Sequence, residues 1–525
     1  MITFADVFYH PQTVYLAHMP DQKKIGSALI SVYHKEGLDK VIRMLDSLGV
    51  TIYATGGTQD FIQSMNINVI PVEELTDFPS ILGGRVKTLH PKVFGGILSR
   101  SDNSDDLLQM EHHKIPAIDL VIVDLYPFTK TVEAGEADSE IIEKIDIGGI
   151  SLIRAAAKNF HDVVIIPSVK DYAILLQTLE TSGGNTTLAF RKQQAAKAFS
   201  VSSAYDTEIR NWISDDSEPV FRNNISEHKK LRYGENPHQE GIFFGDLNEI
   251  FDQLSGKELS YNNLLDIDAA VSLAADFNTP LTAILKHNNA CGLATGETPL
   301  ENWKHALQAD PISAFGGIII TTSEVDETIA NEVGKLFFEV LIAPSYSENA
   351  LNILTEKKNR IILKLKITPA PKHQFRTILN GVLWQDRDSN TEKAENLTTV
   401  TNIVPTTAQI EDLIIANTVA KHSRSNTIVL VKNRRLVAAG CGQTSRVDAL
   451  EQAIEKARKF GLDIIGSVMA SDAFFPFPDC VAIAGKAGIV SVIQPGGSKK
   501  DQESVAYCNE HGISMVLTGI RHFRH

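Results

Sequence analysis

Lys286 and His287 are the adjacent pair whose side chains are best placed for catalysis. They follow an apolar run, Leu-Thr-Ala-Ile-Leu, that predicts a buried strand, and they begin a polar loop. A neutral imidazole can take a proton from an attacking amine, while a neighbouring ammonium stabilises a developing oxyanion. The alternative is a capping histidine beside a surface lysine, and the position at a strand end favours the catalytic pair.

A second set of reactive side chains comes from glycine-containing segments earlier in the chain. Its members are Lys87, Tyr126, Asp146 and Lys158. Together they could supply acid, base and oxyanion-stabilising groups. Simpler interpretations also exist, because Asp146 could cap the following helical turn and Lys158 could be a cation at a helix C-terminus.

An anion-binding turn is predicted beside this set. Gly56, Gly57 and Thr58 follow the apolar strand Thr-Ile-Tyr-Ala-Thr and open a helix, so free backbone N–H groups and a hydroxyl meet at a helix N-terminus. Alone the turn is a weak indication, because many α/β turns contain Gly-Gly. The loop Leu-Gly-Gly-Arg-Val-Lys-Thr-Leu-His-Pro adds Arg85 and Thr88, and its interleaved apolar residues indicate a loop packed onto the domain.

The composition is that of an ordinary soluble protein. The 525 residues are 43% hydrophobic and 22% charged, which allows two or more globular domains. The net charge of −14 argues against binding to nucleic acid. Neither a secretion signal nor a membrane-spanning stretch is apparent, so we expect a cytoplasmic protein. The four cysteines show no disulfide or zinc pattern and are expected to be buried thiols.

The elements that must position these residues alternate between strand and helix. From about Ser27 the chain reads βαβαβ and continues with the apolar strand Asp-Leu-Val-Ile-Val-Asp-Leu, which is typical of a parallel sheet. In such open sheets the ligand lies at the carboxyl ends of the strands. A polar helical stretch and an irregular stretch follow, so we place the first domain at 25–200 and a second, larger α/β domain at 201–525.

The second domain carries further clusters of polar and aromatic residues. They are Arg232-Tyr233, Asp310 to Gly317, Ser425-Asn426, Gly442 to Arg446, Phe474 to Asp479 and Arg521 to His525. Core packing is one interpretation of Phe474 and Phe477, and an aromatic wall for a flat ring is the other. The basic C-terminus suits an anionic substrate.

The order of these segments resembles that of one enzyme family. GGRVKTLHP, LYPF, DIGG, RAAAKN, RYGENPHQ, KHNNACG, DPISAFGG, SDAFFPF, QPGG and RHFRH occur in the order found in the bifunctional purine biosynthesis proteins, AICAR transformylase/IMP cyclohydrolase. The resemblance covers almost the whole chain from about Ser27 to His525. It implies formyl transfer from 10-formyltetrahydrofolate to the 5-amino group of AICAR, giving FAICAR, and then dehydrative cyclisation of FAICAR to IMP without a metal.

The resemblance also implies folds, assembly and site residues. The first domain would be a methylglyoxal-synthase-like open parallel sheet and the second a pair of cytidine-deaminase-like subdomains without zinc. The chain would form a homodimer with transformylase sites shared between subunits, and it would bind small-molecule nucleotides and folate, with no nucleic-acid or membrane partner. The implied catalytic residues are Lys87, Tyr126, Asp146 and Lys158 in the first domain and Lys286, His287 and Asn426 in the second. The implied nucleotide contacts are Ser31, Lys35, Thr55, Gly56, Gly57, Thr58, Arg85, Thr88 and Asn159 in the first domain, and Arg232, Tyr233, Phe315, Glu339, Arg446, Arg521 and Phe523 in the second. Phe474, Phe477 and Asp479 would contact the folate.

Several positions depart from the family's usual pattern. Ala290 stands where proline is common, Pro478 stands where arginine is frequent, and Lys499-Lys500 replaces an apolar-basic pair. Glu36 puts a carboxylate where many members have a hydroxyl near the phosphate. It motivates a second hypothesis, in which the first domain binds a nucleotide without turnover. A third hypothesis is a non-enzymatic regulator, because methylglyoxal-synthase-like domains also serve as allosteric modules.

Overall fold

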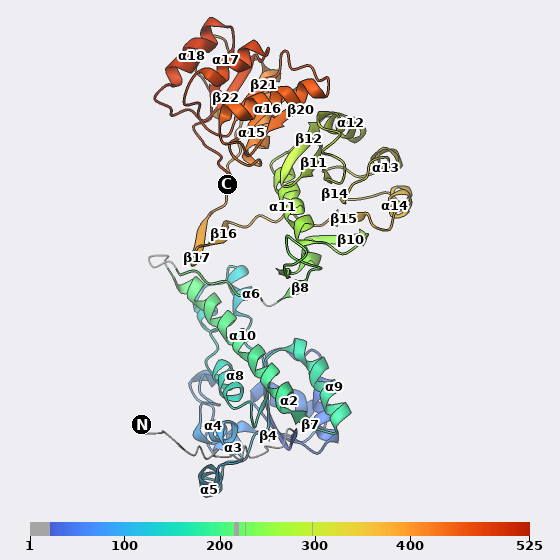
Figure 1. The fold of residues 1–525 in the computed structure, drawn as a ribbon. Coiled ribbons are helices and arrows are strands. Elements are labelled where there is room, and N and C mark those ends of the chain that lie inside the picture. Colours follow the sequence, from blue (N-terminus) through green and yellow to red (C-terminus); the bar gives the residue numbers. More distant parts are fainter. Residues whose placement is uncertain (1–21, 215–219, 226, 297) are drawn as a thin grey trace, which may run out of the picture. The chain divides into compact units, whose positions relative to one another are not determined.

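Two compact units make up the chain, and they divide between Asn224 and Ile225 (Figure 1). The computed structural model describes residues 22–214, 220–225, 227–296 and 298–525. Most of the N-terminal segment judged to lack a secretion signal, residues 1–21, therefore lies outside the described residues. The division comes later in the chain than residue 200, where the sequence suggests a boundary, because helix α10 (Leu188–Ile213) runs through that position.

A five-stranded parallel sheet forms the centre of the first unit, as predicted. Its order is β4-β3-β2-β5-β6. The strands are β2 (Ser27–Ser31), β3 (Thr51–Ala54), β4 (Ile70–Pro71), β5 (Leu120–Val123) and β6 (Val164–Ile166). The chain builds outward from β2 to β4 and then returns to add β5 on the other side of β2. Ligands of parallel α/β sheets bind outside the carboxyl ends of the strands at such a switch in direction.

Helices cover both faces of this sheet, because successive strand residues point to opposite sides. Ala28 and Ile30 pack in one core with α1, α2 and α9, whereas Leu29 packs in a second core with α4, α8 and α10. The helices before α10 are α1 (Leu38–Ser47), α2 (Gly56–Ser64), α3 (Val72–Thr76), α4 (Pro91–Leu98), α5 (Ser104–His112), α6 (Phe128–Glu133), α7 (Asp138–Ile142), α8 (Gly148–Lys158) and α9 (Tyr172–Ser182). A small antiparallel pair, β1 (Gln22–Lys24) and β7 (Asn185–Thr187), lies apart from the main sheet.

The second unit is built on one twelve-stranded sheet whose two halves repeat the same sequence of elements. The first half is β10 (Phe251–Ser255), α11 (Tyr261–Ala275), β11 (Leu281–Lys286), β12 (Asn289–Thr295), α12 (Pro299–Ala309), β13 (Ile318–Thr321), α13 (Glu327–Val333), β14 (Val340–Ala343), α14 (Glu348–Thr355) and β15 (Ile361–Leu365). The second half is β18 (Thr398–Thr399), α15 (Thr407–Lys421), β19 (Ile428–Lys432), β20 (Arg435–Gly440), α16 (Arg446–Lys459), β21 (Val468–Ser471), α17 (Asp479–Lys486), β22 (Ser491–Gln494), α18 (Asp501–Glu510) and β23 (Ser514–Leu517).

The strands also pair in the same way in the two halves of the sheet. In each half an antiparallel hairpin, β11-β12 or β19-β20, is followed by a third strand that pairs antiparallel with the first and by two further parallel strands. The two halves join through β12 and β20, which pair antiparallel at Ala294 and Arg435. Helices α11 and α15 share one core on one face of the sheet, and the other helices form a separate core in each half. This duplication agrees with the expected pair of subdomains.

Two hairpins lie outside the large sheet. They are β8 (His228–Lys230) with β9 (Ile242–Phe244), and β16 (His373–Ile378) with β17 (Gly381–Asp386). The cysteines are largely buried as expected, with Cys441 the most accessible of the four. Within the described parts of the chain, no helix combines the length and the apolar character needed to cross a bilayer.

Candidate active sites

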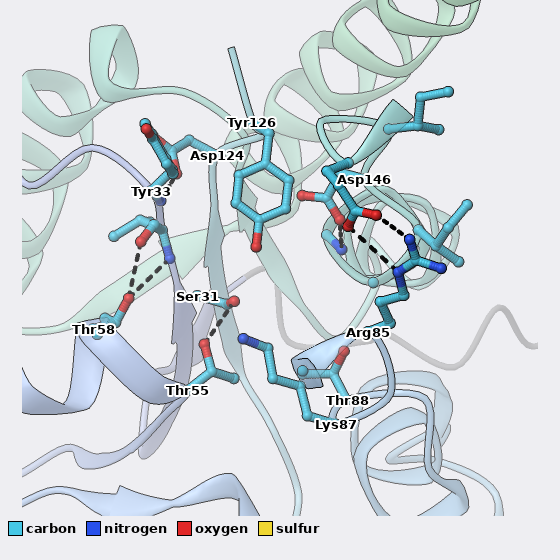
Figure 2. Close-up of a pocket in the computed structure, with 18 of the residues that line it drawn as sticks. Ser31, Tyr33, Thr55, Thr58, Arg85, Lys87, Thr88, Asp124, Tyr126 and Asp146 are labelled. Carbon is cyan, nitrogen blue, oxygen red and sulfur yellow. Dashed lines mark hydrogen bonds and ion pairs between the residues drawn. The ribbon is translucent and has the colours of Figure 1, made fainter. Parts of the chain in front are cut away.

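A cavity of about 720 Å³ opens at the switch point of the first unit, outside the ends of β2, β3 and β5 (Figure 2). The loop before α4 and the N-terminus of α8 close its other side. The residues that line it are Ser31, Val32, Tyr33, Lys35, Thr55, Gly57, Thr58, Gly83, Gly84, Arg85, Lys87, Thr88, Asp124, Tyr126, Ile142, Glu143, Ile145, Asp146, Ile147, Gly148 and Gly149. Most of the side chains that the sequence suggests for the first domain therefore meet in one cavity.

One end of the cavity is rich in hydrogen-bond donors at the N-terminus of α2. The hydroxyls of Ser31 and Thr55 lie 2.9 Å apart, and the Thr58 hydroxyl accepts the Val32 N–H at 3.1 Å. The Lys35 ammonium donates to the Val32 carbonyl and to the Thr58 hydroxyl. Burial lowers the pKa of Lys35, while the nearby carboxylate of Asp124 opposes that shift. A helix N-terminus with hydroxyls and an ammonium around it is suited to a phosphate group.

The opposite end of the cavity holds acid and base groups. Asp146 accepts the Gly149 N–H at 2.6 Å, and burial raises the pKa of this carboxyl despite the opposing hydrogen bond and the charge of Lys87. Burial also raises the pKa of Tyr126, and the neighbouring Asp146 adds to the shift. Figure 2 shows Lys87 and Tyr126 pointing toward the same space, with Ser31 beside them. A carboxyl, a phenol and an ammonium thus converge where a substrate could react.

Buried contacts hold Asp146 in this position. The Tyr205 hydroxyl, from α10, accepts the backbone N–H of Asp146 at 2.7 Å and donates to the Lys144 carbonyl at 2.5 Å. Burial raises the pKa of Tyr205 to about 12, so the hydroxyl stays protonated. The Lys144 ammonium lies 5.8 Å from the ring centres of both Tyr33 and Tyr126. The sequence contains no local signal for Tyr205, because it belongs to a helix far along the chain.

Asp124 is a further pocket residue to which the sequence patterns assign no role. Its carboxylate accepts the backbone N–H of Tyr33 and that of His34, the latter at 2.9 Å, and it pairs with the His34 imidazole at 2.7 Å. Asp124 therefore ties the loop after β2 to the end of β5. Its position directly after an apolar strand could have identified it as a site residue. No sequence pattern indicated the other two unpredicted pocket residues, Tyr33 and Glu143.

Lys158 and Asn159 lie apart from the cavity. Helix α8 begins at the cavity with Gly148 and ends at Lys158, so the two ends are about 15 Å apart at 1.5 Å per residue. The Asn159 amide donates to the carbonyls of Ile97 and Ser99, both at 2.8 Å, which indicates a structural role. The expectation that Lys158 and Asn159 join the other site residues of this domain is therefore not supported by their placement.

Two further positions bear on the predicted phosphate site. Gly56 does not line the cavity, although a side chain there would lie 3.9 Å from the Lys87 ammonium, at the N-terminus of α2. Glu36 is exposed and is absent from the cavity lining. The carboxylate that motivated a binding module without turnover is thus an exposed group that does not line the cavity, although its charge acts on the Lys35 ammonium.

One edge of the twelve-stranded sheet collects the predicted residues of the second unit. Strands β11, β20, β21 and β23 end at this edge and β12, β13, β14 and β19 begin there, as their pairing directions require. The segments at this edge are Lys286-His287, Phe315, Glu339, Asn426, Arg446, Phe474 to Asp479 and Arg521 to Phe523. Arg232 and Tyr233 belong to the irregular opening segment, which is tied to the start of α11 by the Asn262 amide bound to the Glu235 carbonyl at 3.1 Å.

The Lys286-His287 segment is a tight turn rather than the extended loop that the sequence suggests. Strand β11 ends at Lys286 and β12 begins at Asn289, so His287 and Asn288 alone form the turn, with φ of 50° and 63°. The Lys286 ammonium donates to the carbonyls of Phe315 and Gly316, both at 2.9 Å. His287 is exposed. Lys286 and His287 are therefore consecutive residues at the sheet edge, with the ammonium held by the loop before β13.

The residues predicted near Asn426 are connected by a chain of contacts. The Asn426 amide donates to the carbonyls of Gln443 and Thr444 at 3.0 and 3.2 Å. The guanidinium carbons of Arg446 and Arg521 lie 5.7 and 4.4 Å from the ring centre of Phe523. Two guanidinium groups thus meet at the Phe523 ring in the C-terminal segment, which suits an anionic ligand.

Exposure distinguishes between the two interpretations of the phenylalanine cluster. Phe475 is 0% exposed and belongs to the core, whereas Phe474 and Phe477 are 37% and 51% exposed. The Lys500 ammonium lies 4.8 Å from the ring centre of Phe477. The two accessible rings are therefore available to a flat ligand, and Asp479 lies next to them at the start of α17.

Two more predicted contacts have protein partners in the structure. Arg232 lies over the Tyr233 ring at 4.7 Å and donates to its hydroxyl at 2.9 Å. Glu339 pairs with Lys257 at 2.7 Å. Among the described residues, no group of three or more His, Cys, Asp and Glu side chains is arranged to hold a metal ion.

Known protein families match this chain over most of its length. The model of the AICARFT/IMPCHase bienzyme family matches residues 156–456, and that of the MGS-like domain matches residues 37–151. The bifunctional purine biosynthesis protein PurH of Bacteroides thetaiotaomicron is 58% identical over 507 residues, covering 97% of this chain and all of that protein. The proteins of the same name from Aquifex aeolicus and Acetivibrio thermocellus are 46% and 44% identical, each over 95% of this chain and all of their own length. The chain therefore belongs to the AICARFT/IMPCHase bienzyme family, the bifunctional enzymes of purine biosynthesis with AICAR formyltransferase and IMP cyclohydrolase activities.

Proposed function

We propose that the cavity of the first unit closes FAICAR to IMP and that the sheet edge of the second unit formylates AICAR with 10-formyltetrahydrofolate. The observation that carries this assignment is that Lys87, Tyr126 and Asp146 line one cavity together with the N-terminus of α2, which is suited to a phosphate. A nucleotide bound with its phosphate at α2 would extend its base toward these three groups. Both reactions use soluble metabolites, and we assign them to the cytoplasm.

Cyclisation requires the carboxamide nitrogen of FAICAR to attack the formyl carbon, followed by loss of water. Asp146 is the group proposed to take the proton from the amide, because it is half-buried beside the reaction space and desolvation raises its pKa. Lys87 would stabilise the oxyanion that forms on the formyl oxygen, and Tyr126 would protonate it to a hydroxyl. The hydroxyl leaves as water with a second proton, the one that Asp146 took from the carboxamide, while the formamide N–H returns a proton to Tyr126 as the ring C=N bond forms. These steps use the chain's own acid and base groups.

Formyl transfer requires the 5-amino group of AICAR to attack the formyl carbon of the folate. This amine is a poor nucleophile because its lone pair is delocalised into the imidazole carboxamide, so orientation and proton removal matter most. His287 would take the proton, Lys286 would stabilise the tetrahedral oxyanion, and the amide of Asn426 would orient the substrate. The tetrahydrofolate nitrogen leaves as the carbon–nitrogen bond breaks and then carries the proton.

We also infer that two copies of the chain share each transformylase site. Strands β12 and β20 lie between β11, which ends beside His287, and β19, which begins beside Asn426. Each half of the sheet thus carries part of the proposed catalytic set, and these groups must come within hydrogen-bond reach of one substrate. A two-fold homodimer would bring the first half of one subunit to the second half of the other.

A mixture of two inactive variants tests this sharing. His287→Ala and Arg446→Ala each remove one side of the proposed site, and each homodimer should lose formyl transfer. After the two are co-expressed or unfolded and refolded together, random pairing gives mixed dimers with one intact site, so about a quarter of the wild-type activity should return. Formyl-transfer rates of the mixture would be compared with those of each variant refolded alone. Failure to regain activity in verified mixed dimers would place each site within one subunit.

The proposed reactions are tested by product identification. AICAR with 10-formyltetrahydrofolate should give IMP and tetrahydrofolate, and FAICAR supplied alone should give IMP. Formation of FAICAR without IMP would overturn the assignment of the first unit, and IMP from FAICAR without formyl transfer would overturn that of the second. Replacing the formyl donor by formate or by 5-formyltetrahydrofolate is the control, and neither should support the first step.

A further inference from the structure

We propose that Asp266 is a positioning residue for formyl transfer, because its carboxylate holds the turn that presents Lys286 and His287. The proposal rests on the function assigned above to this pair. Asp266 lies in the middle of α11, beneath the turn between β11 and β12. Its Oδ1 atom accepts the Asn288 N–H at 2.6 Å.

The turn needs an external acceptor. In a two-residue hairpin turn the N–H groups of the two turn residues point away from the strand ladder, so the hairpin itself supplies them with no partner. His287 and Asn288 both have positive φ, and such a turn normally contains glycine. Histidine adopts this conformation at a cost in free energy, so surrounding contacts must enforce it. The Asp266 carboxylate is such a contact.

The surroundings of Asp266 indicate that its carboxylate serves the turn. Burial raises the pKa of Asp266, while the Asn288 N–H and the charges of His287 and Lys286 oppose the shift. Aspartate is also a poor residue for a helix interior, so its place in α11 is explained by the turn and not by the helix. Anchoring at Asn288 fixes where β11 ends, and with it the direction of the neighbouring imidazole.

The second half of the sheet contains the same contact between a helix carboxylate and a hairpin turn. In the second half, Asp412 occupies the same place in α15, and its carboxylate oxygens accept the N–H groups of Asn433 and Arg434 at 2.9 and 2.6 Å. Asn433 and Arg434 form the turn between β19 and β20, again with positive φ. A carboxylate beneath the hairpin is therefore a recurring feature of this fold.

The two hairpins differ in what they present. Lys432 matches Lys286, and its ammonium donates to the Ile465 carbonyl at 2.7 Å much as Lys286 binds Phe315. Asn433, however, stands where the first half has His287. The second turn also lies at the opposite edge of the sheet, away from Asn426. Asp412 thus supports a turn without an imidazole, which makes it a matched control within the same chain.

The experiment compares Asp266→Ala, Asp266→Asn, Asp412→Ala and His287→Ala in the full-length chain. Asp266→Ala should lower kcat for formyl transfer by about ten- to a hundredfold, because a small displacement of a catalytic group has effects of that size, while KM for AICAR changes little. Asp266→Asn keeps an acceptor for the Asn288 N–H and should retain more activity. Asp412→Ala should lower the melting temperature about as much as Asp266→Ala, with kcat within about twofold of wild type. FAICAR cyclisation should be unchanged in all four.

Each other outcome has a definite meaning. If Asp266→Ala and Asp412→Ala lower formyl transfer equally, or if cyclisation falls in parallel, Asp266 is only a fold-supporting residue and the proposal fails. If His287→Ala abolishes formyl transfer while Asp266→Ala leaves kcat intact, the proposal fails and the proposed function stands. If His287→Ala itself leaves formyl transfer intact, the assigned catalytic pair is wrong and the role of Asp266 falls with it.

Discussion

His287→Ala is expected to lower kcat for formyl transfer by about 10²- to 10⁴-fold, the range typical for loss of a general base. The amine of AICAR gains a positive charge as it attacks, and without a base the tetrahedral intermediate reverts to reactants. The exposed imidazole on the β11-β12 turn is free to approach that nitrogen. The change removes no buried group, so KM for AICAR and the folding of the unit should be little affected.

The measurement is the rate of tetrahydrofolate formation at saturating concentrations of both substrates. His305→Ala is the matched control, because His305 lies on α12 near the opposite turn with Lys432 and Asn433. This control should keep formyl transfer within about twofold of wild type, as surface substitutions away from a site usually do. Both variants should convert supplied FAICAR to IMP at the wild-type rate. Equal losses of formyl transfer in the two variants would contradict the role given to His287.

The sheet of the first unit and the position of its cavity could be predicted because parallel strands are buried on both faces. Such strands appear in the sequence as short apolar runs, and the residues after them must lie at one edge. Thr58 and Tyr126 were found by this rule, whereas Ser31 came from the family resemblance. Tyr205 was not, because its contact with the Asp146 N–H depends on how α10 packs.

Lys158 illustrates the limit of a motif as a guide to a site. The family resemblance groups it with Asp146 in one catalytic set, and the two segments are continuous in the sequence. The intervening residues form a single helix that carries Lys158 away from the cavity, toward a depression with Arg100 and Asp162. Proximity in sequence becomes separation in space when the connecting element is a helix of this length.

The β11-β12 turn was missed for a different reason. Two-residue hairpins are recognised in sequences by Asn-Gly, Asp-Gly or Gly-Gly, and here the turn residues are His287 and Asn288. The turn forms because Asp266 supplies an acceptor from another element. A local rule has no access to that contact, so the sequence predicts a strand followed by an irregular loop.

Asp146→Asn is expected to lower the rate of IMP formation from FAICAR by about 10²- to 10⁴-fold, because the amide cannot take the proton from the attacking nitrogen. Asparagine has nearly the same shape and can still accept the Gly149 N–H, so the cavity should keep its form. Formyl transfer in the second unit should continue, and FAICAR should accumulate. The exposed Asp105 on α5 is the control position, and Asp105→Asn should leave both rates within about twofold of wild type.

The pH dependence of cyclisation provides the sharper test. Burial raises the pKa of Asp146, and only the ionised carboxylate acts as a base. The wild-type rate should therefore fall as the pH is lowered through this raised pKa, at a higher pH than an ordinary aspartate would show. The small residual rate of Asp146→Asn should lack that acidic limb. If the same limb persists in Asp146→Asn, another group provides the base, and Asp146 serves the cavity only through its hydrogen bond to the start of α8.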